Sequence, residues 1–215
     1  MLLGYKEIKT LLQDRSSSLS ERLIISPILD PDDQLKPGTA SVDLRLGQRF
    51  RVPRRTKLSS LDHLSDEYEA SIEKYKDETF VRIGDYFVLH PRQFVLGETL
   101  EWVHLPNNIS AQVLGRSSWG RDGLIIATAT GIHPSYSGII TLEISNIGEI
   151  PIHIYPGLAI AQLFLMDVRN AGESQPGQST FLASTEPRNA NPARKDKGII
   201  DGFKKRFKKP ATASS

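Results

Sequence analysis

The chain has 215 residues, of which 39% are hydrophobic and 24% are charged, and its formal net charge is +2. These values are typical of a globular protein that can bury a core, and the length fits one domain. Cysteine is absent, which excludes disulfides, a thiolate nucleophile and cysteine-ligated zinc or iron–sulfur centres.

The first part of the chain predicts one short helix and one strand. Residues 4–14 place apolar side chains at helical spacing. Residues 41–52 alternate between apolar and polar side chains, with Asp43 and Arg45 on the polar face, which predicts a strand with one buried side. Residues 60–79 are polar and charged, and we expect a short helix or a loop excursion there.

A series of strand-like segments follows residue 80, and Pro, Gly, Asn or Asp separates most of them. Short strands at this spacing are typical of a sandwich or a barrel, so the predicted fold is mainly β. The segments are FVRI, DYFVLH, QFVLGETLEWV, ISAQVLG, LIIATA, GIITLEISN, IPIHIY and AIAQLFLMDV.

The strand pattern ends at Val168, so we predict a β domain over residues 1–168. Residues 169–198 are polar and rich in Gly, Pro, Ser and Asn, which indicates an extended C-terminal arm or mobile lid. Residues 199–215 form a basic tail that interleaves two Phe residues with Lys and Arg. This tail is compatible with binding to nucleic acid or an anionic membrane surface, or with a solvated, disordered extension.

The sequence predicts a cytoplasmic protein without a transition metal. No apolar run approaches the length of a membrane span, and the N-terminus lacks the pattern of a secretory signal. The five histidines show no H-E-x-x-H spacing, and zinc deaminases need cysteine ligands that this chain lacks. We therefore expect no zinc site.

Residues 115–146 carry the strongest functional signal, because they combine phosphate-binding side chains with one carboxylate in an apolar strand. A triphosphate needs hydroxyl, backbone and guanidinium donors at one place, and Arg116, Ser117, Ser118 and Arg121 supply them. Strand alternation places Glu143 on the face opposite its apolar neighbours. A carboxylate shielded from bulk water suits hydrolytic chemistry, whereas a solvated strand face is the alternative.

Several motifs in this order resemble the metal-ligand-free dCTP deaminases of the dUTPase superfamily. The resemblance runs from about residue 5 to residue 168 and implies a dUTPase-like distorted β-barrel or jelly-roll, a homotrimer and nucleotide sites at the subunit interfaces. The motifs are GTASVDLRLGQRFRV, FVLHPRQFVLGETLEWVHLP, GRSSWGRDGL, GIHPSYSG, ITLEISN and YPGLAIAQL.

The resemblance implies a deaminase that converts dCTP and water into dUTP and ammonia. Glu143 matches the catalytic Glu, which accepts a proton from water and delivers it to the departing amine. Arg116, Ser117 and Ser118 match the groups that bind the phosphates together with Mg²⁺, and Ser117 also lies near the base. Arg121 matches an arginine that helps to order the carboxylate and the water. The alternative for the two serines is that they cap a helix.

The resemblance assigns nucleotide contacts to four further residues. Thr141 and Leu142 flank the catalytic Glu, where backbone groups read the base edge. Gln162 matches a glutamine at the nucleotide, or is a polar residue on the outer face of the last strand. Tyr136 stacks beneath the deoxyribose, or simply packs.

The chain departs from the family pattern in two places. His133 stands where an Asp usually binds the sugar 3′-hydroxyl, and a histidine changes the local charge and titrates near neutral pH. The tail lacks a clear counterpart of the usual closing segment. Two other functions therefore remain open, namely dUTP hydrolysis or a bifunctional reaction that yields dUMP, and a non-catalytic deoxynucleotide-binding regulator.

Overall fold

The structure is a computed structural model that describes residues 1–29, 31–53, 60–65, 67–128, 131–169, 185, 187 and 198. It contains two compact units, one formed by Met1–Pro53 and Glu78–Arg188 and the other by Arg54–Asp77 and Asn189–Ser215. Most of the expected arm over residues 169–198, and all of the basic tail over 199–215, lie outside the described residues.

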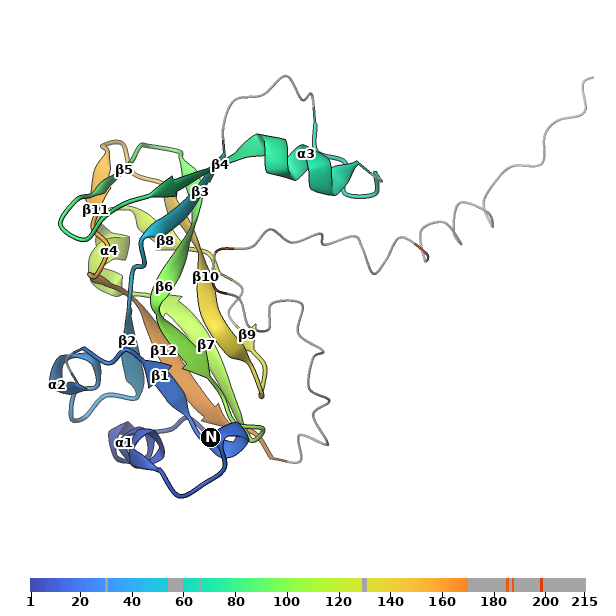
Figure 1. Cartoon of the computed structure of the whole chain (residues 1–215). Coiled ribbons are helices and arrows are strands. Elements are labelled where there is room, and N and C mark those ends of the chain that lie inside the picture. Colours follow the sequence, from blue (N-terminus) through green and yellow to red (C-terminus); the bar gives the residue numbers. More distant parts are fainter. Residues whose placement is uncertain are drawn as a thin grey trace, which may run out of the picture. The chain divides into compact units, whose positions relative to one another are not determined.

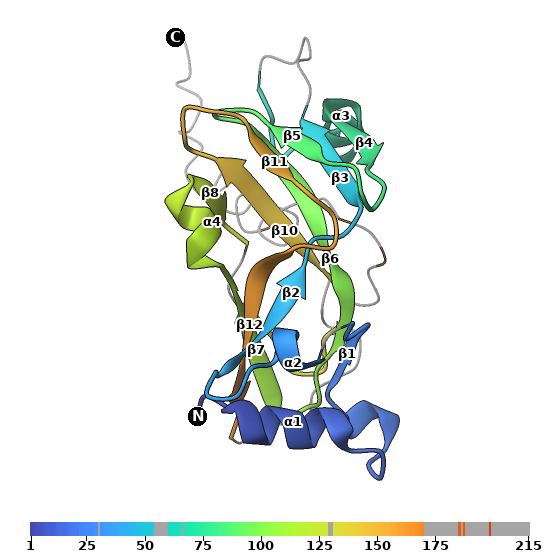
Figure 2. The same cartoon turned by 90° about the vertical axis from the view of Figure 1, so that its left-hand side faces the viewer.

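The first unit is mainly β, as the sequence predicts, and the chain order of its strands is shown in Figures 1 and 2. The largest sheet has the order β4–β3–β6–β10–β8, with β1 also paired to β6. These strands are β1 (Ile24–Ser26), β3 (Arg49–Pro53), β4 (Lys76–Phe80), β6 (Phe94–His104), β8 (Leu124–Ile126) and β10 (Ser137–Asn146), and the first unit contains β4 from Glu78 onward.

A second sheet has the order β2–β12–β7–β9, and β5 pairs with β11 in a separate two-stranded sheet. The described strands therefore form three sheets that do not close into one hydrogen-bonded barrel. The remaining strands are β2 (Ser41–Arg45), β5 (Phe87–Leu89), β7 (Ile109–Gly115), β9 (Gly131–Ile132), β11 (Ile152–Ile154) and β12 (Ala159–Asp167).

Short helices flank the sheets of the first unit. The predicted N-terminal helix is confirmed as α1 (Tyr5–Gln13), and the Gly4 N–H before it donates to the Glu7 carboxylate at 2.8 Å. The others are a 3₁₀ helix (Leu19–Glu21), α2 (Pro31–Gln34) and α4 (Ser117–Arg121). None of the helices in the described part of the chain is long and apolar enough to span a membrane.

The second unit contains α3 (Tyr68–Tyr75), within the segment for which the sequence allows a helix or a loop. Tyr68 and Ile72 are buried one turn apart on this helix, which is the spacing of a helical apolar face. The Tyr68 ring also contacts the His63 ring, with their centroids 4.8 Å apart.

The prediction of a single strand over residues 41–52 is wrong, because the chain changes sheets at Gly47. The Gly47 N–H donates to the Glu98 carbonyl at 2.8 Å, and a Cβ atom at Gly47 would lie only 2.4 Å from the Glu98 Cγ atom. Only glycine allows this close approach to β6. The chain therefore leaves β2 in one sheet and enters β3 in another.

The prediction of one exposed side for β2 is also wrong. Val42 and Leu44 are fully buried, but Asp43 on the opposite face is only 9% exposed. The polar face is covered because the Gln34 and Gln162 side chains contact Asp43. A buried carboxylate needs such polar partners.

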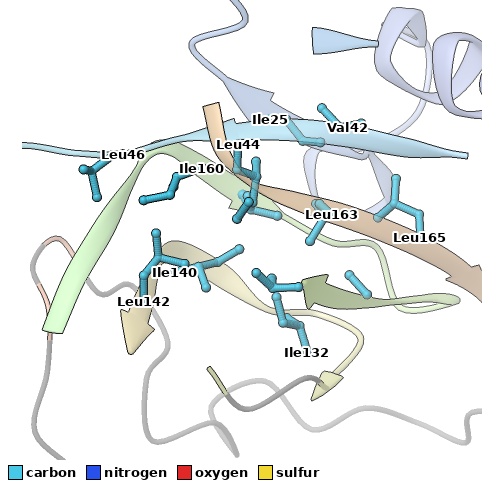
Figure 3. Packing of buried hydrophobic residues seen from close by; sticks show 14 of the residues in the cluster. Ile25, Val42, Leu44, Leu46, Ile132, Ile140, Leu142, Ile160, Leu163 and Leu165 are labelled. Carbon is cyan, nitrogen blue, oxygen red and sulfur yellow. The ribbon is translucent and has the colours of Figure 1, made fainter. Parts of the chain in front are cut away.

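The apolar core lies between facing strands of the two larger sheets. In Figure 3, Leu44 of β2 and Leu163 of β12 point toward Ile140 and Leu142 of β10. Leu44, Leu142 and Leu163 are completely buried. Burial of such side chains is the main favourable contribution to folding, and it fixes β10 against the second sheet.

Candidate functional site

Glu143 belongs to β10, the strand that lies between β6 and β8 (Figure 2). Its side chain is half-buried, whereas Leu142 and Ile144 on either side of it are fully buried, so the predicted alternation is confirmed. Its N–H donates to the Thr128 hydroxyl at 2.9 Å, and its carbonyl accepts from the Ala127 N–H at 2.8 Å. The carboxylate is therefore carried by a backbone that is held in place on the β8 side.

Residues 116–121 follow β7 directly, and Arg116 occupies the N-cap position of the single-turn helix α4. The Arg116 N–H donates to the Ile160 carbonyl at 3.1 Å, which continues the pairing of β7 with β12. The Trp119 indole N–H donates to the Ala159 carbonyl at 2.9 Å. These two hydrogen bonds hold α4 against the beginning of β12.

A tight turn links α4 to β8. Gly123 has φ +89°, and a Cβ atom there would lie 2.8 Å from the Gly148 backbone nitrogen. Glycine is required at this turn because other residues avoid positive φ and would clash. The chain then enters β8, whose Ile126 pairs with Ile144 of β10, so β8 connects α4 to the strand that carries Glu143.

The Arg116 guanidinium contacts the Asp43 carboxylate, with Nη1 and Oδ2 3.3 Å apart. The other Asp43 oxygen, Oδ1, accepts from the Gln162 Nε2 at 3.1 Å, and Gln162 is directly opposite Asp43 in the β2–β12 register. Strands β2 and β12 and the N-cap of α4 thus supply one polar cluster. The side chain of Arg116 remains 34% exposed, which leaves donors available to a ligand.

An open pocket of about 480 Å³ lies beside this cluster. It combines two arginine residues with three aspartates and one tryptophan, a composition that suits a polar, charged ligand. Its lining residues are Asp33, Gln34, Asp43, Arg45, Arg116, Ser118, Trp119, Asp122, Gly157, Leu158 and Ala159.

A further carboxylate is fully buried and contacts two of the residues that line the pocket. Glu101 of β6 accepts from the Arg45 N–H at 2.8 Å and from the Gln34 Nε2 at 3.0 Å. Burial raises the pKa of Glu101 to about 7, against the opposing effect of these hydrogen bonds and of the Arg45 guanidinium. Part of the Glu101 population is therefore protonated at neutral pH.

The other predicted α4 residues are exposed. Ser117 and Ser118 form the first turn of α4, and neither side chain caps the helix. Ser118 lines the pocket, whereas Ser117 does not. Arg121 ends α4, and its guanidinium makes no hydrogen bond or ion pair with the described residues.

The predicted sugar and base contacts lie along β10 and the turn before it. His133 is exposed, and the half-buried Tyr136 donates its hydroxyl to the Ile139 carbonyl at 2.5 Å while packing against the core. Tyr136 therefore has a structural role, and its stacking on a sugar stays a prediction. Thr141 is half-buried opposite Glu98, and the Leu142 side chain is completely buried, which leaves only its backbone for a ligand.

Two groups of candidate residues are therefore distinct in a single chain. Arg116 and Gln162 meet through Asp43, and Glu143 lies on the neighbouring sheet. No hydrogen bond or ion pair between described residues joins the Glu143 carboxylate to Arg116 or Arg121. In the single subunit, the binding cluster and the Glu143 carboxylate are thus not joined by a hydrogen bond or ion pair among the described residues.

The sequence prediction missed Asp43, Gln34 and Glu101 as residues that shape the pocket. The available signal was a carboxylate inside each of two apolar strands, SVDLRL and FVLGETLEWV. Such a residue is rarely buried without a partner, so it indicates a polar contact. The identity of the partner depends on the fold and was not accessible.

Within the described ranges, no group of three or more His, Cys, Asp or Glu side chains could hold a metal ion. The Mg²⁺ expected from the resemblance is thus not matched by a ligand set on the described residues. Phosphate oxygens of a bound triphosphate would have to supply its ligands.

Known proteins are similar to the part of the chain that contains the candidate site. Residues 2–168 match the model of a family described as dCTP deaminase-like. The chain is 42% identical to the dCTP deaminase of Natronomonas pharaonis over 169 residues, which cover 77% of this chain and 84% of that protein. It is also 42% identical to a Halobacterium salinarum protein named dCTP deaminase, dUMP-forming, over 152 residues that cover 70% of this chain and 75% of that one.

A solved structure shares the fold. The 2′-deoxycytidine 5′-triphosphate deaminase from Agrobacterium tumefaciens superposes with a TM-score of 0.56 at 24% identity, and the match covers 76% of this chain and 47% of that one. The mainly β fold predicted from the sequence is therefore found in a solved protein. Since the family model covers more than half of the chain and the relatives are well above 30% identical, the chain belongs to the dCTP deaminase-like family.

Proposed function

We propose that the protein catalyses the hydrolytic deamination of dCTP to dUTP and ammonia. The observation that carries this proposal is Glu143, a half-buried carboxylate on a strand whose backbone is fixed by Ala127 and Thr128. The relatives named dCTP deaminase support the choice of substrate. Rigid placement of one proton-transfer group is what this reaction needs.

In the proposed reaction, the Glu143 carboxylate accepts a proton from a water molecule that attacks C4 of cytosine. Glu143 passes this proton to N3 as hydroxide adds to C4, and it then transfers the remaining hydroxyl proton to the amine, so that the C4–N4 bond breaks, ammonia leaves, and the C4 carbonyl and N3–H of uracil form. Ser117 and Arg121 are proposed to place the water and the carboxylate. Arg116 and Ser118 are proposed to bind the triphosphate, and no step is assigned to the Mg²⁺ that would accompany the phosphates.

The test is ammonia release from dCTP and Mg²⁺ by the full-length protein. Glu143→Gln keeps the shape of the side chain but removes the proton acceptor, and general acid–base groups contribute roughly 10²- to 10⁴-fold. The rate should fall by this factor while dCTP binding persists. Equal rates in the wild type and Glu143→Gln would refute the role of Glu143, and absence of ammonia from the wild type would refute the reaction.

A second candidate is conversion of dCTP to dUMP, because several relatives carry the name dCTP deaminase, dUMP-forming. This reaction also breaks a phosphoanhydride bond and releases pyrophosphate. His133 stands where the family pattern has an Asp that helps to activate the water attacking phosphorus, and this change favours deamination alone. Measuring pyrophosphate together with ammonia separates the two, and equimolar pyrophosphate would establish the dUMP-forming reaction.

We further propose that the complete site forms between subunits of a homotrimer, with Glu143 from one and the Arg116 cluster from another. Their position on different sheets, with no hydrogen bond or ion pair between them among the described residues, supports this arrangement. Glu143→Gln and Arg116→Ala should each be inactive alone. Random assembly of the two variants by co-expression should regain about a quarter of wild-type activity, because on average one site in four combines the two intact residues. No recovery in trimers shown to be mixed would refute the shared site.

A further inference from the structure

Glu101 is a fully buried carboxylate that the proposed reaction does not use. Its two oxygens accept from different parts of the fold, Oε2 from the Arg45 N–H at 2.8 Å and Oε1 from the Gln34 Nε2 at 3.0 Å. The Arg45 Nη1 lies 3.7 Å from Oε1. Burial of a charge is costly unless it is hydrogen-bonded, so these contacts hold β2 and α2 to β6.

The side-chain amide of Gln34 is saturated with hydrogen bonds. Its Nε2 donates to Glu101 and to the Asp43 carbonyl, each at 3.0 Å. Its Oε1 accepts from the Leu29 N–H at 2.9 Å and from the Arg45 guanidinium. An amide has two N–H donors and two acceptor sites, so the Gln34 amide has one orientation, and the Glu101 oxygen is one of the groups that select it.

Asp43 connects the Gln34 amide to the side chains of the pocket. Its carbonyl accepts from Gln34, and its carboxylate contacts Gln162 and Arg116. A continuous series of polar contacts therefore runs from Glu101 through Gln34 and Asp43 to the Arg116 guanidinium. We propose that Glu101 is a positioning residue, which fixes Asp43 through Gln34 and so holds Arg116 in place for the phosphates of the nucleotide.

This inference rests on the proposed function for the identity of the nucleotide, and it makes the binding step sensitive to pH. The groups around Glu101 are the Arg45 guanidinium and backbone N–H from β2 and the Gln34 amide from α2, and burial raises the pKa of Glu101 to about 7. Protonation turns one acceptor oxygen into a donor that faces another N–H donor. The contact with Gln34 or with β2 is then lost as the pH falls below about 7.

The experiment compares wild type, Glu101→Gln, Gln34→Leu and the double variant. The readouts are KM and kcat for ammonia release from dCTP, and the Kd of dCTP, over a pH series that brackets the pKa of Glu101. Glu101→Gln places an NH₂ group against the Gln34 NH₂ or the Arg45 N–H, so KM and Kd should rise roughly 3- to 30-fold at pH values above about 7 with little change in kcat. This ratio to wild type should shrink as the pH falls.

Gln34→Leu interrupts the same series of contacts at α2, and it provides a second test of the positioning role if Glu101→Gln folds poorly. It should raise KM by a similar factor, and the double variant should be no worse than the single ones, because all three break one series of contacts. Glu98→Gln is the matched control. Glu98 is a second buried carboxylate on β6, which accepts from the Arg49 N–H on β3, and its variant should keep the wild-type KM and pH dependence.

The outcomes separate the two proposals. Equal KM and Kd in wild type and Glu101→Gln, a pH-independent ratio, or strictly additive effects in the double variant would overturn the positioning role. If the wild type releases no ammonia from dCTP but Glu101→Gln still weakens dCTP binding, the deaminase proposal is refuted and the positioning role stands.

Discussion

The pKa of Glu101 has a consequence for stability that can be measured without any substrate. The carboxyl has a pKa of about 7 in the folded protein, compared with its ordinary value of 4.5. Between these two pH values the folded state binds one more proton than the unfolded state. The free energy of unfolding therefore falls as the pH rises through this window, and it levels off above about pH 7.

The magnitude follows from the two pKa values. Each pKa unit corresponds to about 1.36 kcal/mol, and the difference between about 7 and 4.5 therefore corresponds to about 3 kcal/mol. Glu101→Gln carries no titrating group at this position. Its free energy of unfolding, relative to that of wild type, should increase by about 3 kcal/mol between pH values near 4.5 and pH values above about 7.

The assay is urea unfolding of the full-length protein at one fixed concentration, with wild type and Glu101→Gln compared at each pH. All other titrating groups are common to both proteins and cancel in the difference. Loss of hydrogen bonds in Glu101→Gln adds an offset that does not depend on pH, so the slope is the measured quantity. A difference that stays constant across the window, or that decreases with rising pH, would show that burial does not raise the pKa of Glu101.

Three further predictions concern the turn before β8, the core and the end of α1. Gly123→Ala should lower the free energy of unfolding by on the order of 2 kcal/mol, because Gly123 has a positive φ and an added Cβ would contact the Gly148 backbone. Gly84→Ala should cost less, because Gly84 has a similar φ but no atom within 4 Å of an added Cβ, and equal costs in urea unfolding would refute the contribution of the contact. Leu163→Ala removes a fully buried side chain and should cost about 2–5 kcal/mol, whereas Leu158→Ala at a 45% exposed position should cost far less in the same assay. Asp14→Asn should lower the free energy of unfolding at neutral pH, because hydrogen bonds from two serine residues lower the pKa of Asp14. The difference from wild type should fade as the pH drops below 3.8, the ordinary pKa of that carboxyl, and a difference that persists in acid would refute this cause.

Features that depend on local periodicity could be predicted from the sequence. α1 follows from helical spacing alone, and the alternation around Glu143 follows from strand geometry, because each pattern repeats within a few residues. The break at Gly47 was not predicted, since apolar and polar residues alternate on both sides of it, with Leu44 and Leu46 before it and Phe50 and Val52 after it. The two strands separate there because Glu98, a residue far along the chain, lies where a side chain at Gly47 would have to be.

The polar contacts of the pocket were predictable only in part. The sequence identified Arg116 and Gln162 through their place in motifs, but not the Asp43 carboxylate that joins them. Glu101 and Arg45 are 56 residues apart, and Gln34 lies in a polar segment that looks like an ordinary turn. Local patterns do not contain such pairings, because they are set by which strands become neighbours.

The two parts of the candidate site are held by different kinds of contact, and this difference predicts how each responds to its surroundings. A hydrogen bond from the Ala127 N–H and one to the Thr128 hydroxyl fix the backbone at Glu143 on the β8 side, and neither bond has a titrating member. Arg116 instead depends on a side-chain series that begins at a carboxyl with a pKa of about 7. Nucleotide binding should therefore change near neutral pH through Glu101, while the placement of the proton-transfer group should not, so that pH acts through this series on KM rather than on kcat.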